Sequence, residues 1–440
     1  MIPQLRSLEE RFGPRLQVVG VHAGKYRAER RTPAIRAAVR RAGIAHPVAN
    51  DRQLRTWRAY ACNGWPTLVL LGPEGRHLGA HAGEIPAGRW APLLERLIDH
   101  YGSRGALRDD QPEWRRQEDP EGGWLRFPAG VAFADGRLYV ADTGHQRVIE
   151  ARLSGDARRA TVVRSFGSGR AGLADGPAAE AGFNHPCGLA AHANRLYVAD
   201  TENHALRAID LSSGAVSTLA GTGAQGYARL AGPALATALS SPADVLADEG
   251  GAIIAMAGFH QLWRYDHGAG TVGPVVGTGA ENLVDGPVAA ALLAQPEALA
   301  AGPGVIYAAD AEGNAIREVR LGGEVRTLVG TGLFAFGDKD GVGDEAELQH
   351  PQGLAWSDGE LYVADTYNHR IKRLDPATRR VASWLGAGSA GREDGAGLAA
   401  RFWEPRGLAV AGRHLLIADT NNHAIRVADR ASGEVWTLEW

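Results

Sequence analysis

The stretch His185–Arg207, HPCGLAAHANRLYVADTENHALR, decides the fold because variants of it recur through the last three-quarters of the chain. Each copy has a proline near its start and, fourteen residues later, a residue that ends a short apolar run. That last residue is aspartate in five copies and methionine in one. The copies repeat every 54 to 58 residues, a period typical of a propeller or a solenoid. The six pairs are Pro128/Asp142, Pro186/Asp200, Pro242/Met256, Pro296/Asp310, Pro351/Asp365 and Pro405/Asp419.

Each copy has the sequence of a four-stranded sheet. In the second copy, the runs 188–191, 196–200, 205–211 and 216–220 are separated by turn residues such as Asn and Ser-Ser-Gly. Runs such as LYVA are apolar on both faces, which is typical of a sheet packed between two others. Helical solenoids are excluded because no copy has a ten-residue stretch with helical periodicity. The pattern predicts an all-β six-bladed β-propeller over residues 124–440.

The composition argues against several classes of function. The formal net charge is −3, and the chain has no basic block, so we do not expect nucleic acid as a partner. Cys62 and Cys187 are the only cysteines and no Cys-x-x-Cys or Cys/His spacing occurs, so we expect no metal, no cofactor and no disulfide framework. A charged amphipathic start and the lack of an apolar run of 18 residues predict a cytoplasmic protein that does not bind membranes.

Residues 1–101 alternate helical and extended patterns and predict a separate small α/β domain. Residues 102–123 are polar, charged and rich in Gly and Pro, and predict a linker. In the small domain we expect helices ending near Arg11, Arg41, Ala61 and Tyr101, and strands at 17–23, 67–71 and 77–82.

Trp65-Pro66-Thr67 lies just before a predicted strand that is followed by a hairpin and a final helix, and in this order the domain resembles a thioredoxin-like fold. The resemblance implies a cis peptide bond before Pro66, and a strand ending in Cys-x-x-Cys ahead of the first helix. That strand and that motif are missing here, so this truncated thioredoxin-like domain is expected to be redox-inactive as written.

The missing strand belongs between the strands at 17–23 and 67–71, whose inner edges are then left unpaired. A buried backbone group without a partner costs about 1–3 kcal/mol. We therefore expect either translation from a codon about 40–60 positions upstream, which would supply the strand and its Cys-x-x-Cys, or a rearranged remnant.

The Pro-x-Gly openings and the runs ADTENHALR (199–207), ADTYNHRIK (364–372) and ADTNNHAIR (418–426) resemble NHL-repeat proteins. With the thioredoxin-like front end, and with IAMAGFHQLW (254–263) and the long segment 333–353, the chain resembles the NHL repeat-containing protein 2-like family over essentially all 440 residues. The resemblance implies a redox-like module followed by a six-bladed NHL β-propeller. The departures are the absent Cys-x-x-Cys and the lack of a further domain after Trp440.

Polar residues that recur once per blade are interpreted as structural, because a residue type needed in every blade serves the blade. The histidines are predicted to bridge neighbouring strands, and the arginines to pair with carboxylates. The residues are His204, His260, His369 and His423, with Asn203, Asn368 and Asn422 before three of them, and Arg207, Arg317 and Arg426.

A ligand site is predicted where the copies differ at a position that converges in space. The first strand of each blade lines the central channel, so the residue inside Pro-x-Gly faces the channel mouth. A solvated channel is the alternative, and no zinc is expected because none of these positions is histidine, unlike in some propeller lyases. The six positions are Ala129, Cys187, Ala243, Glu297, Gln352 and Arg406, and the predicted ligand-binding residues are His185, Cys187, Glu297, His350, Gln352, Glu404 and Arg406.

Five long interblade loops are predicted to be ordered. Each has an aspartate, or alanine in one loop, eleven residues before the blade's proline. Eight positions after that residue lies an apolar side chain that can anchor the loop. These residues are Phe183, Leu239, Leu293, Leu348 and Phe402. Asp338, Asp340 and Asp344 do not fit the spacing of an EF-hand calcium loop, and they are interpreted as a solvated acidic turn.

Three functions remain open on the sequence. The first is a non-catalytic interaction protein whose propeller binds a protein or a small ligand on its upper face. The second is a thiol-disulfide oxidoreductase whose Cys-x-x-Cys lies upstream. The third is a propeller hydrolase or lyase that uses the channel. No catalytic residue is predicted in this chain.

Overall fold

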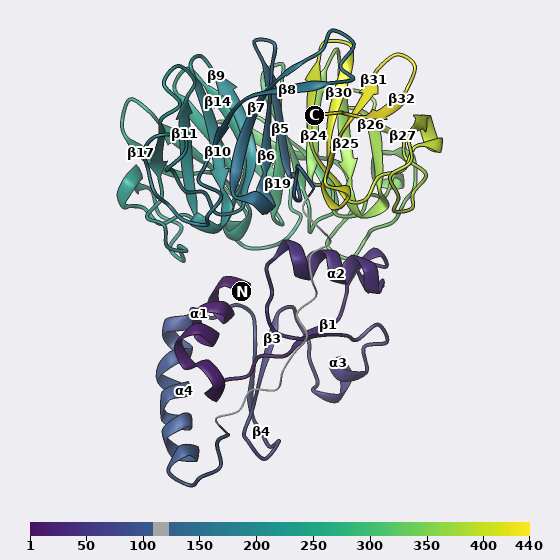
Figure 1. Cartoon of the computed structure of the whole chain (residues 1–440). Helices are drawn as coiled ribbons and strands as arrows, with labels where there is room; N and C mark the ends of the chain where they lie inside the picture. The colour runs from purple at the N-terminus through teal and green to yellow at the C-terminus, as the bar shows by residue number, and fades with distance from the viewer. Residues whose placement is uncertain (109–122) are drawn as a thin grey trace. The chain divides into compact units, whose positions relative to one another are not determined.

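The computed structural model describes residues 1–108 and 123–440, which belong to two compact units, Met1–Glu121 and Gly122–Trp440 (Figure 1). Most of the predicted linker, 102–123, lies outside the described residues. Each unit is described by itself below.

The second unit is a six-bladed β-propeller, as the sequence predicts. Each blade is an antiparallel sheet built from consecutive residues, and in the second copy the strand bounds lie within two residues of the predicted ones. Blades 1 to 3 consist of β5 (Gly130–Ala134), β6 (Arg137–Asp142), β7 (Arg147–Leu153) and β8 (Ala160–Phe166); β9 (Pro186–His192), β10 (Arg195–Asp200), β11 (Ala205–Asp210) and β12 (Val216–Ala220); and β14 (Pro242–Asp248), β15 (Gly251–Met256), β16 (Gln261–Asp266) and β17 (Thr271–Val276). Blades 4 to 6 consist of β19 (Pro296–Gly302), β20 (Val305–Asp310), β21 (Ala315–Val319) and β22 (Glu324–Val329); β24 (Gly353–Ser357), β25 (Glu360–Asp365), β26 (Arg370–Asp375) and β27 (Arg380–Leu385); and β29 (Pro405–Ala411), β30 (His414–Asp419), β31 (Ala424–Asp429) and β32 (Glu434–Thr437).

The interblade loops are ordered. The five predicted apolar residues are all buried, with at most 1% of their surface exposed, so these loops are pinned to the blades as predicted. Four loops also contribute a two-residue fifth strand to the outer edge of a blade, which the sequence did not predict. These strands are β13 (Gly232–Pro233), β18 (Gly286–Pro287), β23 (Gly341–Val342) and β28 (Gly395–Ala396).

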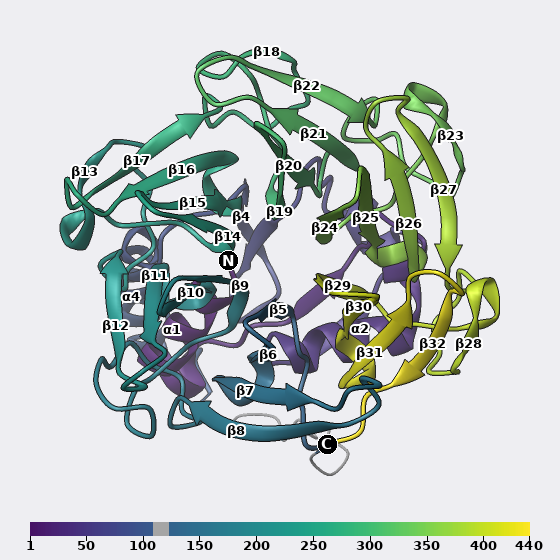
Figure 2. The same ribbon diagram turned by 90° about the horizontal axis from the view of Figure 1, so that it is seen from above.

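The first strands of the six blades surround the central channel, and each contacts the first strands of both neighbours (Figure 2). The glycine of Pro-x-Gly permits this approach. A Cβ on Gly130 would lie 1.9 Å from the carbonyl oxygen of Cys187 in the next blade, and one on Gly353 would lie 2.0 Å from that of Arg406. The motif therefore holds the inner strands close together, and the residue inside it lies at the channel.

A hydrogen bond from a backbone N–H to a side chain ties each blade to the next. The acceptor is the side chain of a residue in the left-handed conformation, with φ between 47° and 55°, and the donor is the N–H of the residue before the next blade's proline. The predicted structural role of the four histidines is thereby confirmed, since each accepts this bond through Nδ1. The pairs are Gln146/His185, His204/Ser241, His260/Gln295, Asn314/His350, His369/Glu404 and His423/Phe127.

Blades 2, 4 and 6 contain a buried arginine that links the second strand to the interblade loop. In blade 2, Arg207 donates to Asp200 at 3.0 Å and to Asp175 at 2.8 Å, and it also donates to two loop carbonyls. None of its side-chain surface is exposed. The predicted pairing of the arginines with carboxylates is confirmed, and Arg317 and Arg426 make the same set of contacts.

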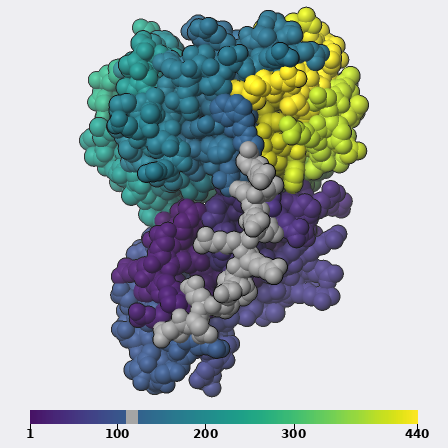
Figure 3. Space-filling view, in the orientation of Figure 1, coloured from purple at the N-terminus to yellow at the C-terminus, as the bar shows by residue number. Residues whose placement is uncertain are grey.

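The ring closes between blades 6 and 1, which adjoin in the space-filling view as yellow and blue surfaces (Figure 3). Besides the bond from Phe127 to His423, Thr420 Oγ1 donates to the carbonyl of Pro128, and the N–H of Ala160 donates to the carbonyl of Glu439. A shared apolar cluster includes Leu138 of blade 1 and Leu416 of blade 6. No strand is exchanged between the two blades.

In its described residues, 1–108, the first unit is a small α/β region with four α-helices and two separate two-stranded sheets. Parallel strands β1 and β2 form one sheet, and antiparallel strands β3 and β4 form the other. At the proline that the thioredoxin-like resemblance singles out, the Trp65–Pro66 peptide bond is cis. The elements are α1 (Ile2–Phe12), β1 (Gly20–His22), α2 (Thr32–Arg41), β2 (Val48–Asn50), α3 (Arg55–Ala59), β3 (Thr67–Leu71), β4 (His77–Ala82) and α4 (Ala87–Gly102).

The two half-sheets of this unit are not joined. β1 and β3 are not hydrogen-bonded to each other, in agreement with the expectation that their inner edges lack a partner strand. The apolar cluster of the unit contains only three buried residues, Leu8, Ala91 and Leu94. Val19 and Val21, on or next to β1, are 56% and 43% exposed.

Two predictions for this unit were wrong in detail. The helix expected to end near Ala61 is only the five-residue α3: Leu54 before it is in the left-handed conformation, and Asp51 accepts hydrogen bonds from the N–H groups of Arg55 and Trp57. β2 was not predicted. Among the described residues, no helix is long and apolar enough to cross a membrane.

Candidate functional site

The residues inside the Pro-x-Gly motifs, which we call the channel-mouth residues, are Ala129, Cys187, Ala243, Glu297, Gln352 and Arg406. They lie at the starts of the six inner strands that surround the channel (Figure 2). Blades 1 to 3 contribute Ala, Cys and Ala, whereas blades 4 to 6 contribute Glu, Gln and Arg. The mouth therefore has a half with small side chains and a half with large polar ones.

Glu297 and Gln352 are in direct contact across the seam between blades 4 and 5. The amide Nε2 of Gln352 donates to Oε2 of Glu297 at 2.5 Å. Because a carboxylate only accepts hydrogen bonds, this contact fixes the orientation of the amide and turns its oxygen away from Glu297. Gln352 is 6% exposed, and Oε1 is buried with no hydrogen-bond partner among the described residues.

Arg406 is a half-buried cation without a counter-ion. Its guanidinium forms no hydrogen bond or ion pair with any described residue, and its Nε is buried. This contrasts with the buried arginines of blades 2, 4 and 6, each of which contacts two aspartates. Of its side-chain nitrogens only Nε is buried without a partner, and the residue is half-buried, so the Arg406 guanidinium can meet an anion from outside the chain.

Cys187 is an unreactive thiol at the same mouth. Its Sγ donates to the carbonyl of His185 at 3.4 Å. Burial raises the pKa of the thiol to about 11, while the charge of Arg406 acts to lower it and that of Glu297 to raise it. The thiol is therefore neutral near pH 7 and a poor nucleophile, and Arg406 and Glu297 are both near enough to influence it from blades 6 and 4.

The residues before the prolines make contacts between and within the blades. The N–H groups of His185, His350 and Glu404 donate the bonds that tie the blades together. The ring of His185 lies 3.3 Å from Glu202, and that of His350 lies 3.3 Å from Glu312. His350 also stacks on Tyr367, with ring centroids 4.7 Å apart. These three predicted site residues thus already make contacts with their own or neighbouring blades, and the candidate site is built on the other four, Cys187, Glu297, Gln352 and Arg406.

Asp244 is a residue near the mouth that was not predicted. It occupies the glycine position of the motif in blade 3, and its carboxylate accepts the N–H groups of Leu299 in blade 4 at 2.8 Å and of its own neighbour Val245 at 2.9 Å. Burial raises its pKa to about 7. The signal in the sequence was the departure of Pro242-Ala243-Asp244 from Pro-x-Gly.

Replacing Asp244 with Asn is expected to change how stability depends on pH. The folded chain retains a proton on Asp244 that the unfolded chain releases near pH 4, so this group makes the wild type less stable as pH rises from about 4 to about 7. Relative to the variant, the unfolding free energy of the wild type should fall over that window in urea titrations at pH 4.5, 6 and 7.5. Asp266→Asn, at an exposed turn, is the control, and parallel profiles for wild type and Asp244→Asn would contradict the assignment.

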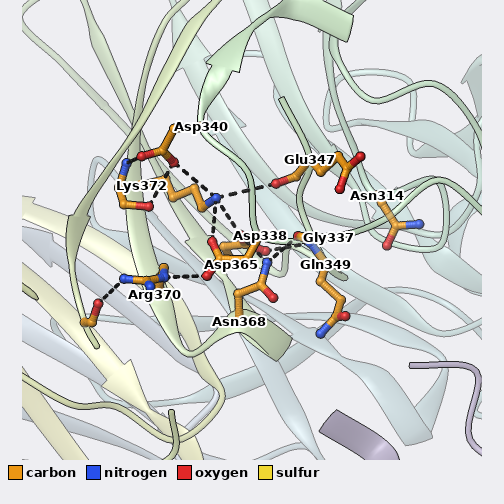
Figure 4. A network of polar contacts seen from close by, with 12 residues as sticks. Asn314, Gly337, Asp338, Asp340, Glu347, Gln349, Asp365, Asn368, Arg370 and Lys372 are labelled. Atoms are coloured by element: carbon orange, nitrogen blue, oxygen red, sulfur yellow. Dashed lines mark hydrogen bonds and ion pairs between the residues drawn. The ribbon is translucent and has the colours of Figure 1, made fainter. Parts of the chain in front are cut away.

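A second polar cluster lies in blade 5 and corrects one interpretation. Lys372 replaces the buried arginine, and its Nζ lies 2.9 Å from Asp338, 3.4 Å from Asp340 and 3.5 Å from Asp365 (Figure 4). Arg370 also pairs with Asp338. Asp338 and Asp340 therefore do not form a merely solvated acidic turn, since they help to neutralise a buried ammonium group. Across residues 1–108 and 123–440, no group of three or more His, Cys, Asp or Glu is arranged to hold a metal ion.

The fold and its repeated contacts define a closed propeller of NHL-type blades. The family model described as NHL repeat matches residues 125–149, 348–374 and 402–428, which lie in blades 1, 5 and 6. The chain therefore carries NHL repeats within a six-bladed β-propeller. The predicted resemblance to the NHL repeat-containing protein 2-like family is confirmed by similarity over nearly the whole chain.

Two relatives illustrate the extent of that similarity. The chain is 37% identical to NHL repeat-containing protein 2 of Bos taurus, over 98% of this chain and 64% of the relative. It is 39% identical to Protein SUPPRESSOR OF QUENCHING 1, chloroplastic, of Arabidopsis thaliana, over 100% of this chain and 44% of the relative. The chain thus spans less than two thirds of the length of either protein.

The chain is also similar to solved structures at low identity. A structural genomics protein of unknown function from Bacteroides thetaiotaomicron is 18% identical with a TM-score of 0.48, and the match covers 69% of each chain. A virginiamycin B lyase from Staphylococcus aureus is 11% identical with a TM-score of 0.44, over 71% of this chain and 84% of that one. At these values neither likeness supports an inference about function.

Proposed function

We propose that this protein is a non-catalytic binding protein whose propeller takes an anionic ligand at the channel mouth. The observation that carries the proposal is the unpaired guanidinium of Arg406, which is half-buried beside Cys187 and the Glu297–Gln352 pair. The three fully buried arginines described in the blades, Arg207, Arg317 and Arg426, each pair with two aspartates. A cation held without such a partner, at the point where six strands converge, fits a binding role better than a structural one.

The N-terminal unit is proposed to be a thioredoxin-like module that is redox-inactive in this chain. Support comes from the order of its elements and from the separation of β1 and β3, between which the thioredoxin-like resemblance places a strand. Cys62 has no second cysteine near it in sequence. A hydrolase or lyase in the channel gains no support, because the only thiol there is held neutral and its neighbour Arg406 is a donor, not a base.

Arg406→Ala is expected to weaken the binding of an anionic ligand by about ten- to a hundredfold, the loss expected for a charge-assisted hydrogen bond worth about 1.5–3 kcal/mol. Native mass spectrometry of the chain purified from lysate, followed by titration of the ligand it retains, measures the change. Arg380→Ala is a matched control, since Arg380 is exposed on the outer strand of blade 5. Equal binding by both variants would move the site away from the channel mouth.

A further inference from the structure

The polar half of the channel mouth presents a donor and two acceptors on three consecutive blades. Blade 6 supplies the guanidinium of Arg406, which requires an anion. Blade 5 supplies the buried Oε1 of Gln352, which requires a donor, and blade 4 supplies the carboxylate of Glu297, which is held in place by the Gln352 amide. An anion alone would pair with Arg406 but would leave the buried Oε1 of Gln352 without a donor.

The other half of the mouth offers an apolar lining. Ala129, Cys187 and Ala243 hold the equivalent positions on blades 1 to 3, and their side chains are much smaller than those of Glu297, Gln352 and Arg406 on blades 4 to 6. Cys187 is neutral and behaves there as a small apolar group. A ligand that fits both halves has a charged head with an anion and a donor side by side, and a short apolar tail.

We propose that the channel mouth binds a free α-amino acid with an apolar side chain. The α-carboxylate pairs with Arg406, the α-ammonium donates to Gln352 Oε1 and Glu297, and the side chain packs toward Ala129, Cys187 and Ala243. This assignment rests on the binding site proposed above, and it adds the requirement that one ligand carries both charges. A planar guanidinium is suited to two-point recognition of a carboxylate, and a carboxylate with an amide oxygen is suited to an ammonium group.

Isothermal titration calorimetry on the full chain separates the two charges. The probes are L-leucine, leucinamide, which lacks the carboxylate, and 4-methylpentanoate, which lacks the ammonium. L-Leucine should bind at least tenfold more tightly than either analogue. Arg406→Ala should weaken L-leucine at least tenfold and leave leucinamide unchanged, whereas Glu297→Gln should weaken L-leucine and leave 4-methylpentanoate unchanged.

Two further variants keep the test decisive. Arg380→Ala controls for the loss of an arginine, and Ala243→Leu fills the apolar half without touching a polar group, so it should weaken L-leucine more than L-alanine. Circular dichroism and the Tm of each variant confirm that it is folded, and Arg406→Gln replaces Arg406→Ala if the latter unfolds.

The outcomes distinguish the two levels of the proposal. If 4-methylpentanoate binds as tightly as L-leucine and depends on Arg406, the amino-acid assignment is overturned while the anion site stands. If L-leucine, L-valine, L-alanine and L-phenylalanine all fail to bind at millimolar concentration, the amino-acid assignment is likewise overturned. If the probes bind but Arg406→Ala changes the affinity of none of them, both the amino-acid assignment and the proposed site at the channel mouth are contradicted.

Discussion

Lys372→Met is expected to lower the free energy of unfolding of the propeller by about 3–5 kcal/mol, because removing one partner from a buried ion-pair network leaves the other charges uncompensated. None of the Lys372 side chain is exposed, and its ammonium group neutralises Asp338, Asp340 and Asp365 together (Figure 4). Methionine fills a similar volume, so the loss reports the charge and not a cavity.

The same variant should depend on pH in a defined direction. Burial raises the pKa of Asp365 to about 6 even with Lys372 present. Without the ammonium group this carboxyl has a still stronger tendency to take up a proton, so the deficit of the variant should be smaller at pH 5 than at pH 7. Urea unfolding at pH 5 and pH 7 measures this loss of unfolding free energy. Lys339→Met is the control, as Lys339 is exposed in the same loop. If Lys372→Met loses less than about 1 kcal/mol at pH 7, the three carboxylates are neutralised in another way.

Arg207→Met is expected to lower the free energy of unfolding by a similar amount, about 3–5 kcal/mol, because it leaves the Asp200 carboxylate buried without its cation. Burial already raises the pKa of Asp200 to about 6. The chain itself contains an apolar version of the same site. In blade 3 the equivalent positions are Met256 and Trp263, and Trp263 donates from its Nε1 to Gln261 and stacks on Phe259.

Replacing this site in blade 2 with the apolar residues of blade 3 should therefore restore much of the lost unfolding free energy. The graft is Asp200→Met, Asn203→Phe, Ala205→Gln and Arg207→Trp, and we expect its stability to return to within about 1–2 kcal/mol of the wild type, since apolar groups of matching shape replace a buried ion pair at little cost. Guanidinium unfolding of wild type, single variant and graft gives the comparison. If the graft is no more stable than Arg207→Met, the apolar arrangement stabilises a blade only when it is packed against the residues that surround it in blade 3.

The blades were predictable from the sequence because each carries its own start, turn and core pattern at a fixed offset. The interblade bonds were only partly predictable. His204 and His423 stood out by repetition, whereas Gln146 and Asn314 fill the same place with other side chains, because the site demands only an acceptor on a left-handed residue. Strands of two or three residues such as β2 and β13 were missed because so short a stretch has no period.

The candidate site shows the same limit. The register of Pro-x-Gly placed the channel-mouth residues on the correct strands. It did not reveal which partners they have, since Glu297 and Gln352 meet across two blades that are 55 residues apart in sequence. Asp244 was missed because the prediction considered only the residue inside the motif and not the glycine position itself.

The closure between blades 6 and 1 bears on how the propeller folds. All other neighbouring blades are joined by contacts between residues a few tens apart, whereas Phe127 and His423 are 296 residues apart. Bringing together the ends of a loop of that length costs about 1.5 kcal/mol more in chain entropy than closing one of about 55 residues. This seam is therefore expected to form last during folding and to open first under load. The rings of Trp124 and Trp440 lie against each other with centroids 5.7 Å apart. A short peptide joining these ends, with new termini at the exposed Ser212–Ser213 turn, should therefore give a circular permutant that carries the same entropy cost at a different seam.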